Sequence, residues 1–172
     1  MPRRVYNNVE DHRVVVNGIV VEDVTSVEIP TWEHPTNTYE NVAGVPMNLE
    51  IPNTTRVNAM ELTVNHNMGV NGERLRDPGK LTIEVRVARQ YLATMEADVK
   101  HGGMKYRMTC MHKSTAPGTV EAGNPMGYAE TYSVLSYEEL VDGQQVALVD
   151  AAGGTIRKNG RQISDDVEAL LR

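Results

Sequence analysis

The sequence predicts a mainly β protein, an antiparallel two-sheet β-sandwich or half-open barrel with one flanking α-helix. Three observations lead to this class. Several segments alternate apolar with polar residues, β-branched residues are abundant, and Asn-Gly or Asp-Gly pairs separate apolar runs. The chain has no Phe, so we expect an aliphatic core made chiefly of valine. Its 172 residues suit one domain spanning 1–172.

The first expected element is a hairpin near the N-terminus. Residues 14–16 and 19–21 are apolar and flank Asn17-Gly18, a pair that favours a tight turn because both positions need positive φ. Residues 26–29 then alternate as in a strand, which ends at Pro30.

The middle of the chain changes its period. Residues 60–66 and 81–87 alternate apolar with polar side chains, which predicts two strands with one wet face each. From Ala88 the apolar residues Leu92, Met95 and Val99 have helical spacing, so we expect a short helix over 89–100 that ends at Gly102-Gly103. Residues 67–79 are expected to form a turn-rich bridge.

The last third reads as strands and hairpins. Residues 106–112 alternate, and 114–127 contain enough Gly and Pro to predict a loop. Residues 131–141 and 145–149 flank Asp142-Gly143, which predicts a second hairpin.

The C-terminal segment, 159–172, begins with a third turn pair, Asn159-Gly160. Ser164 is a candidate N-cap for a final short helix, with Asp165 and Asp166 favourably placed in the first turn. We expect Leu170 and Leu171 to dock the apolar side of that helix.

An unusually long excursion occupies residues 36–58. It is almost uncharged, and a structureless loop of this length inside a compact domain is uncommon unless it is functional. Its first half reads as a loop, and 47–51 alternate as in a short strand or the arm of an extended hairpin. We expect it to contact another copy of the protein through its apolar residues, which are Tyr39, Val42, Val45, Met47, Leu49 and Ile51.

Composition excludes several classes of function. A formal net charge of -6 argues against a protein whose main work is gripping phosphate backbones. Cys110 is the single cysteine, so no internal disulfide can form. The N-terminus does not read as a signal peptide, and no apolar run approaches the roughly 20 residues of a membrane span. We therefore expect a protein kept in the cytoplasm unless it leaves as part of a larger particle.

No motif points to catalysis, a cofactor or a metal, and we expect none of the three. Cys110 and His112 would share one strand face, but a metal site needs three or four ligands and nothing nearby completes the set. Phosphate-binding glycine motifs and nucleophile elbows are absent from the sequence.

Several pieces, taken in order, resemble the major tail tube protein of contractile-tailed bacteriophages, a family also found in R-type pyocins. The resemblance covers roughly 5–69 and 128–172, and a strand-like segment at 81–87 stands where the family has its helix. The pieces that carry it are Val14-Val15-Val16-Asn17-Gly18, Ser26-Val27-Glu28-Ile29-Pro30, Tyr39-Glu40, Ala43-Gly44, Pro46, Met47-Asn48-Leu49-Glu50, Ala59-Met60-Glu61-Leu62, Val141-Asp142-Gly143 and Lys158-Asn159-Gly160.

This resemblance implies a structural subunit of a tail tube. Six copies would form a ring, rings would stack, and the excursion at 36–58 would reach the adjacent ring. The implied partners are the tail sheath protein, the tape measure protein, baseplate and terminator proteins, and DNA passing through the channel, with no membrane anchoring. The implied location is the virion tail, assembled in the host cytoplasm. Sheath contacts would use the outer helix and the C-terminal segment from Asn159, with Arg161, Asp165 and Asp166 as candidates.

Two other readings remain open. The chain could be the tube subunit of another contractile injection system or a bacteriocin, which the sequence does not separate from a phage tube. A small β-barrel ligand-binding protein or enzyme would instead be a monomer with an apolar pocket. For a tube, the acidic balance predicts that lumen-facing strand positions are polar and predominantly acidic, because such a wall would repel phosphate.

Overall fold

The protein is mainly β, as the sequence predicts. The computed structural model describes residues 3–163 and 165–172. The strands in chain order are β1 (Arg4–Val16), β2 (Ile19–Val21), β3 (Val24–Glu28), β4 (Thr36–Tyr39), β5 (Leu49–Pro52), β6 (Met60–His66), β7 (Lys80–Ala93), β8 (Asp98–Ala116), β9 (Tyr128–Val141), β10 (Gln144–Asp150), β11 (Thr155–Lys158) and β12 (Arg161–Gln162). The two short helices are α1 (Gly72–Leu75) and α2 (Asp165–Leu170).

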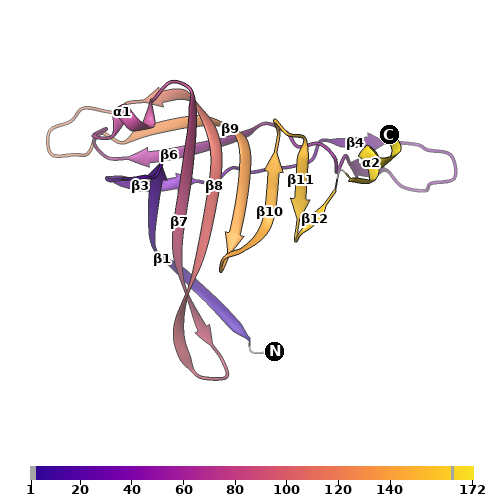
Figure 1. The fold of residues 1–172 in the computed structure, drawn as a ribbon, viewed down its shortest axis with the longest axis horizontal. Helices are drawn as coiled ribbons and strands as arrows, with labels where there is room; N and C mark the ends of the chain where they lie inside the picture. The colour runs from indigo at the N-terminus through magenta and orange to yellow at the C-terminus, as the bar shows by residue number, and fades with distance from the viewer. Residues whose placement is uncertain (1–2, 164) are drawn as a thin grey trace.

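Ten of these strands form one antiparallel sheet whose main path runs β12-β11-β10-β9-β8-β7-β1-β2. Strand β9 is the branch point: residues 128–134 pair with β6, and residues 136–141 pair with β10. Strand β6 in turn pairs with β3. The sheet curls through this branch without closing into a barrel among the described residues, and the half-open expectation is confirmed (Figure 1).

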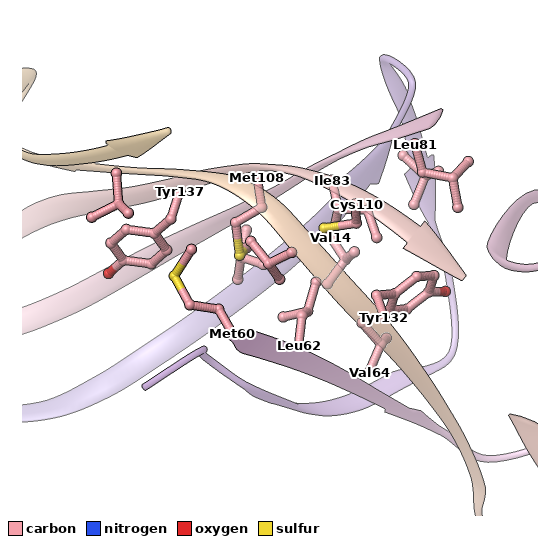
Figure 2. Close-up of a cluster of buried hydrophobic side chains, with 14 of the residues drawn as sticks. Val14, Met60, Leu62, Val64, Leu81, Ile83, Met108, Cys110, Tyr132 and Tyr137 are labelled. Carbon is pink, nitrogen blue, oxygen red and sulfur yellow. The ribbon is translucent and has the colours of Figure 1, made fainter. Parts of the chain in front are cut away.

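The core lies inside the curl of the sheet, between β6 on one side and β1, β7 and β8 on the other. Figure 2 shows Met60, Leu62 and Val64 of β6 pointing toward side chains of β1, β7 and β8. Alternation explains this arrangement, because the buried side chains of β6 are every second residue. With no Phe available, Tyr132 and Tyr137 supply the aromatic volume of the core.

The three expected turns are present. Asn17 and Gly18 have φ of 49° and 84°, and Asp142 and Gly143 have φ of 49° and 83°. The third pair, Asn159-Gly160, joins β11 to β12 with φ of 48° and 80°. The positive φ at both positions of each pair is what a two-residue hairpin turn requires, since its twist must match that of the strands.

The helix expected over 89–100 is wrong. Strand β7 continues to Ala93, a turn with φ of 50° at Ala97 follows, and β8 begins at Asp98. Leu92 lies opposite Val99 across the resulting hairpin. The helical spacing was coincidental, and pairing of β7 with both β8 and β1 outweighs a local helix propensity worth only tenths of a kcal/mol per residue, about 0–0.7.

The other elements differ from expectation mainly at their ends. Strand β8 extends to Ala116, and the following loop is correspondingly shorter than predicted. The bridge over 67–79 contains the small helix α1, which the turn residues concealed. Helix α2 forms where predicted, although Ser164 lies outside the described residues. Leu170 and Leu171 do not dock: their exposed fractions are 87% and 82%.

Candidate functional site

The excursion forms a two-stranded arm that is separate from the large sheet. Strand β4 pairs antiparallel with β5, from Thr36 opposite Pro52 to Tyr39 opposite Leu49. Figure 1 shows this arm projecting from the body on the same side as α2. The expectation of an extended hairpin arm is therefore met, but its first half also contains a strand, which the alternation around 47–51 alone did not reveal.

Most apolar side chains of the arm remain in solvent. Val45 is half-buried, and the other five candidates, Tyr39, Val42, Met47, Leu49 and Ile51, are exposed. None of the six belongs to the hydrophobic core. An isolated two-stranded hairpin is marginally stable in water, and exposed apolar surface of this kind is typical of an interaction site.

The base of the arm is tied to the C-terminal part of the sheet. The backbone N–H of Asn58 donates to the carbonyl of Glu33 at 2.9 Å. His34 Nδ1 lies 2.6 Å from the carbonyl oxygen of Arg56, and its Nε2 lies 2.9 Å from Lys158 Nζ. The same ammonium lies 4.8 Å from the Trp32 ring centroid. These contacts hold the arm base against β11.

The C-terminal candidates lie beside that base. Arg161 is in β12, and Asp165 and Asp166 open the exposed helix α2. A hollow of about 490 Å³ separates the arm base from this segment. Its lining residues are Thr54, Thr55, Lys158, Arg161, Ile163, Asp166 and Val167. The structure thus brings the arm base and part of the predicted sheath-contact segment together, while Asp165 is not among the residues that line the hollow.

A second exposed apolar surface was missed by the sequence reading. The β7–β8 hairpin extends beyond the core together with the first half of β1 (Figure 1). Arg89 stacks over the Tyr6 ring at 4.3 Å, and Arg4 over the Tyr91 ring at 5.0 Å. The exposed apolar residues here are Val5, Tyr6, Val9, Leu92, Met95 and Val99. Treating 88–99 as strand rather than helix would have placed them together.

A buried polar cluster surrounds Glu130 on β9. Its fully buried carboxylate accepts hydrogen bonds from Arg76 at 2.8 Å and Thr115 at 2.5 Å, and His112 Nε2 lies 2.9 Å away. Burial alone would raise the pKa of Glu130, but these partners hold it below its ordinary value. Because Arg76 caps α1, the cluster fastens that helix to the sheet.

Cys110 and His112, which share one face of β8, have different surroundings. Cys110 lies in the core, where burial raises the pKa of its thiol to about 12, whereas His112 is engaged by Glu130. Across residues 3–163 and 165–172, no group of three or more His, Cys, Asp or Glu side chains could hold a metal ion. No helix in those ranges is long and apolar enough to span a membrane.

The outer face of β7, β8 and β9 is polar and ordered into rows. Thr82, Thr109 and Ser136 form one row across the three strands, and Glu84, Arg107 and Glu138 form the next. A third row contains Arg86, Lys105 and Leu140. No large apolar side chain in these rows is exposed, since Leu140 is half-buried. We refer to these nine residues as the polar strip.

Comparisons with known proteins agree with this architecture. The model of the family described as phage tail tube protein FII matches residues 7–171. None of the curated proteins compared with the sequence matches it.

Solved structures of an extracellular contractile injection system share the fold. One shows the PVC sheath/tube terminator in the extended state: TM-score 0.52, 13% identity, with 78% of this chain and 96% of that chain covered. Another shows the PVC sheath-tube complex in the extended state: TM-score 0.51, 12% identity, with 76% and 88% covered. At such identities the likeness concerns the fold alone. The family match, in contrast, extends over nearly the whole sequence, and the chain therefore belongs to the phage tail tube protein FII family.

Proposed function

We propose that this protein is a structural subunit of a phage tail tube, in which hexameric rings stack around a channel that conducts DNA. The observation that carries the proposal is the β4–β5 arm, a hairpin apart from the large sheet on which five large apolar side chains are exposed. Repetition of one contact between copies, with a rise, generates a tube. The apolar side chains of the arm would be covered by the adjacent ring.

The proposed role needs no catalytic activity, cofactor or metal. The work of the subunit is to be stiff, self-complementary and inert toward what passes through it. Its further partners would be the sheath protein, through the C-terminal segment from Asn159, and the tape measure, baseplate and terminator proteins. The assembly would form in the host cytoplasm and remain in the virion tail without membrane anchoring.

The polar strip is our candidate for the channel wall. In an assembly the exposed apolar surfaces become covered, while a strip without exposed large apolar side chains can stay exposed to solvent. On this placement the wall would be polar, as the sequence predicts. Its charge would be mixed, however, rather than predominantly acidic, because carboxylates and cations alternate along it.

Negative-stain electron microscopy of the purified protein at high concentration tests the assembly. We expect rings or tubes of constant diameter. A protein that stays a monodisperse monomer, with the arm ordered against its own core, would exclude the tube function and favour the small ligand-binding alternative.

A second candidate is the tube of a non-phage contractile injection system or a bacteriocin. The shared fold with PVC components favours keeping this alternative. The two assemblies would have the same ring and arm, so microscopy of the tube does not separate them. Capsid and portal genes next to the coding sequence are expected for a phage, and their absence beside sheath and baseplate genes would favour the alternative.

A further inference from the structure

Cations and carboxylates on the polar strip are arranged by depth. The side chains of Glu84 and Glu138 are 12% and 19% exposed, whereas those of Arg86 and Arg107 are 55% and 48% exposed. The carboxylates therefore form the floor, and the cations lie above them toward solvent. Lys105, at 38% exposed, completes the upper layer.

Glu84 is the shared partner of all three cations. Its Oε1 lies 2.5 Å from Arg86 Nε and 3.7 Å from Lys105 Nζ, and its Oε2 lies 3.4 Å from Arg107 Nε. Partial burial alone would raise the pKa of Glu84, but the three cations hold it below its ordinary value, so the group is ionised at neutral pH.

Glu138 completes the arrangement from the neighbouring strand. Its Oε2 lies 3.1 Å from Arg107 Nη1, and its Oε1 accepts from Gln145 at 2.7 Å. Two carboxylates therefore form ion pairs with three cations. Arg13 of β1 stands opposite Arg86 and forms no ion pair within the described part of the chain. The strip is close to neutral only because Glu84 and Glu138 are present.

A hollow beside the strip reaches two of these cations, and its lining also includes the carboxylates of Asp11 and Asp142. Its volume is about 720 Å³, and its lining includes the small residues Ala88 and Gly103. Arg13, Arg86 and Lys105 also line it. Without Glu84, Arg86 and Lys105 would be free to contact phosphates, and each contact releases counterions from DNA.

We propose that Glu84, supported by Glu138, prevents the strip from retaining duplex DNA by keeping Arg86, Lys105 and Arg107 in ion pairs. The biological meaning rests on the proposed tube function, since a channel wall must let DNA pass. The chemistry itself is a property of the single chain. The wall would be non-adhesive through local pairing, a different device from the general acidic repulsion that the net charge suggests.

Fluorescence anisotropy with a labelled duplex of mixed sequence tests the inference on the purified full-length protein. The variants are Glu84→Gln, Glu138→Gln and the double variant. Glu61→Gln is the matched control, because Glu61 forms an exposed pair with Lys113 and its loss changes the net charge equally. Each variant is first checked for an unchanged urea midpoint and circular dichroism spectrum.

We expect Glu84→Gln to bind DNA at least tenfold more tightly than Glu61→Gln at low salt. Its plot of log affinity against log salt concentration should be steeper than that of the wild type by about 2, since two released cations contribute about 0.9 each. The addition of Arg86→Gln should reverse part of the gain. If Glu84→Gln does not fold, Glu138→Gln serves instead and should show a smaller gain through Arg107.

A folded Glu84→Gln variant that binds no more tightly than Glu61→Gln would overturn the inference, as would a Glu138→Gln variant without any gain where only that variant folds. Micrographs of the wild-type preparation separate this result from the proposed function. Tubes without a gain in DNA binding would leave the tube function standing and remove the inference. A gain in DNA binding without tubes would support the ion-pair mechanism and contradict the tube function.

Discussion

At the scale of single residues, the buried charge of Glu130 is the feature that sequence reading could least foresee. Glu130 falls within 128–134, where alternation assigns it to the inner face of β9, and an inward-facing carboxylate has no local explanation. Its partners come from distant segments: Arg76 follows α1, and His112 and Thr115 lie on β8. Only the folded topology brings them together.

Removal of this charge should destabilise the protein. Glu130→Gln keeps the shape but weakens the hydrogen bonds from Arg76 and Thr115, so we expect the free energy of unfolding to fall by about 1–3 kcal/mol. Urea denaturation measures the change. Glu61→Gln, on an exposed carboxylate, should change stability by less than about 0.5 kcal/mol. Equal effects of the two variants would contradict a structural role for the cluster.

The same carboxylate predicts an acid-labile component of stability. The pKa of Glu130 in the folded state lies below its ordinary value of 4.5, so its stabilising contribution is present above that value and is lost as pH falls through the lower folded-state pKa. Urea midpoints measured from neutral pH down to about pH 3 should therefore fall more steeply for the wild type than for Glu130→Gln. Parallel curves would show that other carboxylates dominate the acid response.

At the scale of elements, tight turns and alternating strands were predictable because their determinants are local. Asn17-Gly18 and Asp142-Gly143 favour the positive φ angles that their turns need. In β6 the buried side chains are every second residue, so the alternation in the sequence identifies them. The β7–β8 hairpin was not predictable in the same way. Leu92, Met95 and Val99 fit a helix locally, and only pairing with β1 and β8 decides between the two structures.

The contacts of Lys158 with His34 and Trp32 at the base of the arm lead to a prediction about the mobility of the arm. Lys158→Met removes the donor to His34 Nε2 and the cation over Trp32. We expect faster amide hydrogen exchange at Asn58, whose N–H bonds to Glu33 next to His34. Lys113→Met, which removes an exposed lysine elsewhere, is the matched control. Unchanged exchange at Asn58 would mean that backbone pairing alone fixes the arm base.

At the scale of the whole molecule, the exposed apolar side chains are concentrated in features that project from the core or lie at its margins. Most of them lie on the β4–β5 arm, on the extended β7–β8 hairpin with the first half of β1, and in the C-terminal segment around helix α2, and the others include Ile19, Val20, Met68, Val70, Met111 and Val120. A monomer would leave all three in water, whereas an assembly covers them. The sequence already marked the arm by its length and composition, and the family match over residues 7–171 supports the assembly it suggested.

The central claim is that the arm joins one ring to the next, and deletion of residues 42–51 tests it most directly. This change removes the arm's tip together with the first three residues of β5, and it leaves the core strands untouched. Electron microscopy of the deleted chain beside the wild type is the measurement. We predict that the wild type forms tubes, while the deleted chain folds and forms single rings that do not stack. Tubes of normal length from the deleted chain, or loss of its fold, would contradict the claim.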